Sequence, residues 1–158
     1  MITKVISKSD QKRLLQQVES NNKYTAIILI FLDAGLRVTE CASLKLSNLD
    51  FVHDLISINS LKKRKTSSKK VRDIPMTQRL REALIIWVGS LDSKGKDSYV
   101  FPTNSKTGHI SRSRIWRYIK KVTGGRYTTH DLRHTFATTI EEKYKDVRMV
   151  QALSLIHI

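Results

Sequence analysis

The sequence predicts a mainly α-helical domain that contains one small antiparallel β-sheet, an α+β fold, and two observations lead to this fold class. Apolar residues recur at helical spacing through most of the 158-residue chain. Residues 51–76 instead place short apolar stretches on either side of a basic, polar segment, which is typical of a β-hairpin. A chain of this length can bury one ordinary core, so we expect residues 1–158 to form a single domain.

Two helices are expected to open the chain. Residues 7–21 and 22–34 both carry apolar side chains at helical spacing, and the second segment ends at Gly35, a residue type that commonly terminates helices. A short helix should follow, with Thr39 as its N-cap and Glu40 favourably placed in its first turn. The chain therefore begins with a packed helix pair and a short third helix.

The predicted sheet is inserted among the helices. Ile56 and Ile58 mark one strand, Val71 and Ile74 mark the next, and the basic segment between them supplies a polar turn. Sequential strands joined by a turn pair antiparallel, so we expect a hairpin.

Helical periodicity returns after the sheet. We expect a helix over residues 77–91, a basic amphipathic helix over 111–123, and a further helix over 128–144. Two glycines directly after the basic helix form its stop signal. A final helix is expected to start near Asp146.

The chain carries a large excess of positive charge. Its 29 Lys and Arg residues against 14 Asp and Glu residues give a formal charge of +15, which favours a polyanionic partner, nucleic acid first. Acidic residues are missing from two basic segments, 61–72 and 98–130, whereas the alternative, a solvated basic surface, would mix both signs. The side chains expected to contact DNA phosphates are Lys62, Lys63, Arg64, Lys69, Lys70, Arg112 and Arg114.

Cysteine content and apolar patterning suggest a cellular compartment. Cys41 is the only cysteine, so an intrachain disulfide is excluded and a reducing cytoplasm is the natural location. We expect its thiol in the core, together with Trp87 and Trp116. The longest apolar run, residues 26–32, is too short to span a bilayer, and we find no signal-peptide core. We expect a soluble protein that does not bind membranes.

The segment that begins at residue 128, TTHDLRHTFATT, has the pattern of a helix start. Thr128 and Asp131 form a Thr-x-x-Asp capping box. Leu132, Phe136 and Ile140 follow at a spacing of four residues and are expected to face the core. The motif therefore lies at the N-terminus of a helix whose apolar stripe is buried.

Two side chains of this motif can converge on one target. His130 and Arg133 are three residues apart on a helix and share a face beside its N-terminus, where an anionic oxygen, such as that of a phosphate, is favoured. A zinc site built on His130 and His134 is the alternative, but the zinc-protease pattern needs a Glu after the first His, and Asp131 is used by the cap. A purely structural polar helix start is the third interpretation.

Three motifs in order resemble the catalytic domain of tyrosine recombinases, the phage integrase family: AGLRVTECASLKLSNLDF, a lysine-bearing hairpin that ends in RDIPM, and HDLRHTFAT. The resemblance covers about residues 8–153. It implies that fold and a metal-free, cofactor-free reaction. In that reaction a tyrosine attacks a DNA phosphate and leaves a phosphotyrosine link and a free sugar hydroxyl, which later rejoins the DNA. It further implies a double-stranded DNA partner, multimers on DNA, monomers in solution, and a prokaryotic or phage-encoded protein associated with the nucleoid.

The resemblance also assigns site residues. Arg37 matches the first catalytic arginine, Glu40 the acid that supports it, and His130 and Arg133 the His-x-x-Arg pair. Lys65 best fits the hairpin lysine that protonates the leaving sugar oxygen. The competing hairpin lysines are Lys63, Lys69 and Lys70. His134 is expected to be structural.

The end of the chain departs from the family pattern. The family continues with a Leu-Gly-His motif and a helix that carries the nucleophilic tyrosine, whereas this chain continues with SLIHI, in which no Gly precedes His157. Tyr144 is the only tyrosine after Arg133, and it lies one helix too early. We therefore expect a C-terminally truncated catalytic domain without the N-terminal core-binding domain, which binds DNA but lacks the nucleophile. The alternatives are a noncatalytic DNA-binding module, a type IB topoisomerase relative and a metal-dependent hydrolase.

Overall fold

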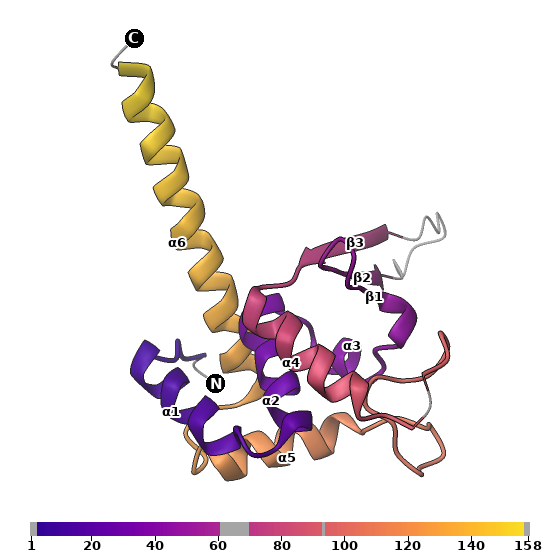
Figure 1. Ribbon diagram of the computed structural model, residues 1–158. Helices are drawn as coiled ribbons and strands as arrows, with labels where there is room; N and C mark the ends of the chain where they lie inside the picture. The colour runs from indigo at the N-terminus through magenta and orange to yellow at the C-terminus, as the bar shows by residue number, and fades with distance from the viewer. Residues whose placement is uncertain (1–2, 61–69, 93, 157–158) are drawn as a thin grey trace, which may run out of the picture.

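The computed structural model describes residues 3–60, 70–92 and 94–156, which form a helical body with one three-stranded sheet at its side (Figure 1). Its α-helices are Lys8–Val18 (α1), Asn22–Leu29 (α2), Val38–Ala42 (α3), Gln78–Gly89 (α4), Arg112–Val122 (α5) and Thr129–Ile156 (α6). Its shorter turns are the π-helical Ile30–Ala34 (η1) and the 3-10 turn Leu46–Asn48 (η2). Its strands are Leu49–Asp50 (β1), Leu55–Ser60 (β2) and Lys70–Pro75 (β3). The predicted fold class is confirmed. No helix in these ranges is both long and apolar enough to cross a bilayer.

Most helices start at a polar side chain that accepts a hydrogen bond from the backbone of the first turn. These N-caps are Ser7, Asn21, Thr77 and Ser111. The expected cap Thr39 is wrong, because α3 already begins after Arg37. The carboxylate of Glu40 reaches back and accepts the Arg37 backbone N–H at 2.8 Å, which starts the helix two residues earlier.

The apolar run of residues 26–32 is the centre of the core. Each of its side chains is at most 5% exposed, because α2 packs against α1 and α4 while η1 packs against α6. Cys41 is also fully buried, as expected. Trp87 is half-buried and donates its indole N–H to the Val100 carbonyl at 2.7 Å. The prediction that Trp116 lies in the core is wrong: it is 42% exposed on the outer face of α5, beside Lys120.

The chain turns sharply where η1 ends. Gly35 adopts a left-handed conformation, with φ of 63°. A Cβ atom at this position would overlap the ring of Phe136 on α6. Asp33, two residues earlier, forms a bidentate pair with Arg79 at 2.6 Å and accepts a hydrogen bond of 2.5 Å from the Thr77 hydroxyl. The turn therefore holds the start of α3 close to α6.

The sheet contains the predicted hairpin and one short additional strand, β1, in the order β1-β2-β3 with antiparallel pairs. Ile56 pairs with Ile74, and Ile58 pairs with Arg72. Ile56 and Ile58 are buried, whereas Val71, on the opposite face, is 59% exposed. Arg72 and Ile74 consequently lie on the face that covers the core.

Helix α6 runs without a break from Thr129 to Ile156, so the expected separate helix near Asp146 is wrong. Residues 129–156 contain neither Gly nor Pro, and nothing in the local sequence stops the helix. The core stripe is also shorter than predicted, because Leu132 is buried but Ile140 is 47% exposed. Figure 1 shows the reason: the second half of α6 extends away from the rest of the domain.

Candidate active site

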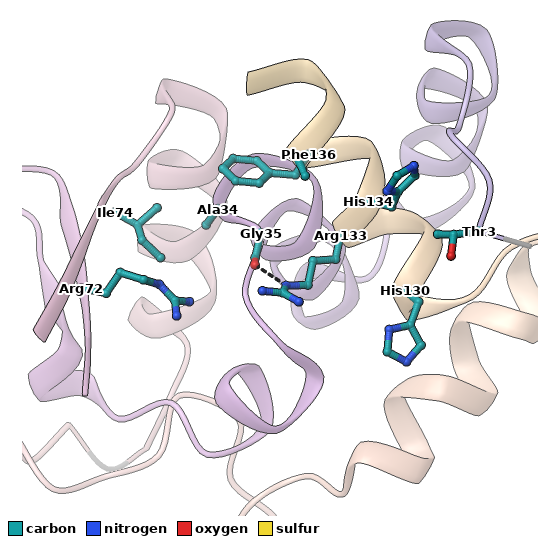
Figure 2. A pocket seen from close by; sticks show the side chains of 10 residues that line it. Thr3, Ala34, Gly35, Arg72, Ile74, His130, Arg133, His134 and Phe136 are labelled. Atoms are coloured by element: carbon teal, nitrogen blue, oxygen red, sulfur yellow. Dashed lines mark hydrogen bonds between the residues drawn. The ribbon is translucent and has the colours of Figure 1, made fainter. Parts of the chain in front are cut away.

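A cavity of about 610 Å³ lies where three elements meet: the Gly35 turn, strand β3 and the first turns of α6 (Figure 2). Its described lining residues are Thr3, Ala34, Gly35, Arg72, Ile74, His130, Arg133, His134, Phe136 and Ala137. Two of the four predicted catalytic residues, His130 and Arg133, are therefore in one cavity.

The capping box at the start of α6 is confirmed. The Asp131 carboxylate accepts the Thr128 backbone N–H at 2.8 Å, and the Thr128 hydroxyl accepts the Asp131 backbone N–H at 3.4 Å. Asp131 also accepts the Lys4 backbone N–H at 2.9 Å, and Thr135 accepts that of Ile6 at the same distance. The buried polar side chains of this motif thus fix the helix and the N-terminal segment, while His130 and Arg133 remain directed to the cavity.

Arg133 is held by a backbone contact. Its Nε donates a hydrogen bond of 2.9 Å to the Gly35 carbonyl oxygen, and its guanidinium group extends into the cavity (Figure 2). Burial lowers the pKa of Arg133, as do the positive charges of Arg37 and Arg72, while Glu40 opposes the change. An arginine remains charged at any physiological pH. An anion in the cavity would therefore relieve the repulsion among these cations.

Arg37 is the N-cap of α3 and does not itself line the cavity. Its side chain is 56% exposed, and its Nη1 lies 3.6 Å from Oε2 of Glu40. Glu40 is only 14% exposed, so this carboxylate is well placed to orient the guanidinium group. Arg37 is close enough for its charge to act on Arg133.

Arg72 lines the cavity and was missed by the sequence analysis. Its Nη2 donates to Oε1 of Glu40 at 3.1 Å. A signal was present in the sequence, because a spacing of two places Arg72 on the same strand face as Ile74. A charged residue on a buried strand face requires a partner.

The histidines of the motif are both exposed. His130 lines this cavity and two neighbouring ones, so it lies between the cluster of arginines and α5. His134 lines the cavity as well. Within residues 3–60, 70–92 and 94–156, no three His, Cys, Asp or Glu side chains gather in a metal-binding arrangement.

The predicted DNA-contacting residues divide into three groups. Arg112 lines a cavity of about 390 Å³ together with Trp116, Arg117 and His130. Arg114 is exposed elsewhere on α5. The pKa of Lys23 is lowered mainly by the burial of Lys23 itself, and the positive charge of Arg114 lowers it further. The remaining predicted DNA contacts concern the hairpin: Lys70 is the first residue of β3, and Lys62, Lys63, Arg64 and Lys69 lie outside the described residues. The predicted catalytic residue Lys65 lies outside them as well.

Comparisons with known proteins agree with this arrangement. The family model described as "Phage integrase family" matches residues 4–154. Tyrosine recombinase XerA of Thermococcus onnurineus is 29% identical over 156 residues, which are 96% of this chain and 54% of the relative. A tyrosine recombinase of Pseudothermotoga lettingae is 32% identical over 148 residues, which are 90% of this chain and 48% of the relative. The chain thus spans about half the length of these relatives.

Solved structures share the fold. The crystal structure of XerA recombinase has a TM-score of 0.74 and 27% identity, over 96% of this chain and 55% of that one. The integrase from mycobacterium phage Brujita has a TM-score of 0.67 and 25% identity, over 96% of this chain and 48% of that one. Because the family model covers nearly all of the sequence and the site motifs converge in space, the chain belongs to the phage integrase family of tyrosine recombinases.

Proposed function

We propose that this chain is the phosphate-activating part of a tyrosine recombinase that breaks and rejoins double-stranded DNA through a phosphotyrosine intermediate. One observation carries the proposal: Arg72, Arg133 and His130 line one cavity, with Arg37 beside it and Glu40 as the carboxylate that pairs with two of the arginines. This arrangement has excess positive charge in a partly buried site, which suits a phosphodiester.

Arg37 and Arg133 act on the phosphate oxygens. Negative charge builds on the nonbridging oxygens as the attacked phosphorus becomes five-coordinate, and a guanidinium group can bind two of these oxygens at once. The Gly35 carbonyl fixes the direction of the Arg133 side chain before the phosphate arrives. Removing one such preorganised donor typically reduces the rate by about 10²–10³-fold.

His130 and Lys65 complete the proton chemistry. The exposed imidazole of His130 borders the cavity, where it orients the phosphate and assists proton movement near neutral pH. Lys65 protonates the leaving sugar oxygen, and strand β3, which lines the cavity through Arg72 and Ile74, follows the segment that contains this lysine.

The reaction also needs a tyrosine. None of the described residues that line the cavity is a tyrosine, and Tyr144 is 61% exposed, further along α6. The proposal therefore requires the nucleophile from further polypeptide or from a second molecule.

Duplex DNA is the proposed partner, bound across the cavity and the basic face of α5. The structure of XerH bound to its difH substrate has a TM-score of 0.68 and 18% identity to this chain. The Tn1549 transposon integrase has been solved in complex with circular intermediate DNA. The formal charge of +15 supports the same partner here, and binding would place the protein at the nucleoid. Multimers would assemble on DNA from monomers.

Covalent trapping tests the proposal. The 158-residue chain and a version extended by the C-terminal segment of the XerA relative are incubated with nicked or phosphorothiolate duplexes that contain the recognised site. We expect a covalent protein–DNA adduct only with the extended protein, and none when its added tyrosine is replaced by phenylalanine. An extended, folded protein that binds DNA without forming adducts would favour a noncatalytic DNA-binding module.

A further inference from the structure

Arg72 has an unusual position for a charged residue on a strand. It pairs with the buried Ile58 across the β2–β3 ladder and shares the core-facing side of the sheet with Ile74. Figure 2 shows its guanidinium group directed into the cavity, toward that of Arg133. A side chain that only solubilised the sheet would point to the opposite face, where Val71 is exposed.

A single carboxylate connects Arg72 to Arg37. Oε1 of Glu40 accepts the Arg37 backbone N–H at 2.8 Å and the Arg72 Nη2 at 3.1 Å, while Oε2 lies 3.6 Å from the Arg37 Nη1. The Arg72 side chain and the Arg37 backbone N–H thus both donate to Oε1 of Glu40, which leaves Oε2 for the Arg37 guanidinium group. Without Arg72, this largely buried carboxylate could rotate, and the half-exposed Arg37 side chain would lose its fixed partner.

We propose that Arg72 is a positioning residue of the phosphate site. It acts through Glu40 to aim Arg37, and it thereby joins strand β3 to the arginine pair, Arg37 and Arg133. The inference rests on the proposed function, because it assigns to Arg72 the orientation of a phosphate-binding group. It also means that strand β3 and Arg37 are aligned by one hydrogen-bonded unit.

Phosphate binding by the 158-residue chain tests the inference without requiring catalysis. The Nε–H of Arg133 is followed by ¹H–¹⁵N NMR while inorganic phosphate is added at constant ionic strength. Arg72→Met keeps the apolar stem of the side chain and removes its donors, so it disturbs packing least. We expect Arg72→Met to weaken phosphate binding by about tenfold, the effect of one charge-assisted hydrogen bond, and Arg72→Lys to recover part of the loss.

Arg81→Met is the matched control. Arg81 pairs with Asp54 at 2.6 Å and is 39% exposed, close to the 36% of Arg72, but it does not line the cavity. Both variants remove one positive charge from an ion pair, so the control measures the general electrostatic effect. Equal weakening by the two variants would overturn the inference while leaving the phosphate site intact.

The Glu40→Gln background separates a positioning role from direct contact. If Arg72 acts through Glu40, adding Arg72→Met to Glu40→Gln has little further effect on phosphate affinity. A full tenfold loss in both backgrounds would mean that Arg72 binds phosphate itself, which would overturn the positioning role. If phosphate does not shift the Arg133 signal in the unmodified chain, the phosphate site fails and the proposed function fails with it.

Discussion

The Nε atom of Arg133 donates a hydrogen bond of 2.9 Å to the carbonyl oxygen of Gly35, which lies 98 residues earlier in the chain. This contact joins the two segments that carry the proposed phosphate-binding arginines: the turn before α3, which ends in Arg37, and the first turns of α6. It depends on the left-handed backbone of Gly35, which allows the turn to approach α6 closely. The geometry of the arginine pair is thus tied to one glycine.

Replacing this glycine should destabilise the protein. We expect Gly35→Ala to lower the free energy of unfolding by about 3 kcal/mol, because alanine is strained at positive φ and its Cβ would overlap Phe136. Denaturant titration measures the change. Gly89→Ala is the control, since Gly89 lies in α4 with no atom within 4 Å of an added Cβ, and it should be neutral or slightly stabilising. Equal stabilities of the two variants would contradict the role of Gly35.

Arg133 should be essential for strand cleavage. In an extended protein that forms adducts, we expect Arg133→Ala to slow adduct formation by about 10²–10³-fold, because a preorganised cation at the phosphate is lost. Arg133→Lys should restore little, since an ammonium group cannot bind two oxygens and cannot keep the same bond to Gly35. Single-turnover kinetics at saturating DNA give the rates, with circular dichroism to check folding. Near-normal cleavage by the alanine variant would exclude Arg133 from the phosphate site.

The salt dependence of DNA binding should show whether Arg37 and Arg133 contact DNA phosphates. Each lost phosphate contact makes the slope of log affinity against log salt less steep by about 0.9, so Arg37→Ala with Arg133→Ala should change it by about 1.8. Fluorescence anisotropy with duplex DNA over a range of salt concentrations measures the slope. Arg13→Ala with Arg81→Ala removes the same charge from ion pairs away from the cavity. If the two double variants have the same slope, the arginine pair does not contact DNA.

The acid response of Asp10 should depend on Tyr127. A hydrogen bond of 2.6 Å from the Tyr127 hydroxyl is the main cause that lowers the pKa of Asp10 below 3.8, and the charge of Arg126 adds to it. This carboxylate therefore stabilises the fold above its unfolded pKa, and the contribution is lost as the pH falls through its lowered folded pKa.

We expect Tyr127→Phe to raise the pKa of Asp10 toward 3.8, and Arg126→Ala to raise it by less. Titration of the Asp10 carboxyl carbon by NMR measures both changes. An unchanged pKa in the phenylalanine variant would show that the hydroxyl does not bind the carboxylate in solution.

Local sequence was sufficient for much of the fold. The capping box of Thr128 and Asp131 and the apolar run of residues 26–32 are short-range patterns, and each was confirmed. The predictions that failed concern features set by distant neighbours. Ile140 follows the helical spacing of the core stripe but is exposed, because α6 extends beyond the body that would cover it.

The sequence by itself determined the family motifs and, through them, the candidate residues Arg37, His130 and Arg133, because each motif lies within a single helix or turn. Only the tertiary structure decided how they are oriented. The Gly35 carbonyl orients Arg133 through a hydrogen bond that spans 98 residues, and the Glu40 carboxylate beside Arg37 is itself held by Arg72, 32 residues later. Neither contact has a local pattern, since the first forms only when η1 packs against α6 and the second only when strand β3 lies beside α3.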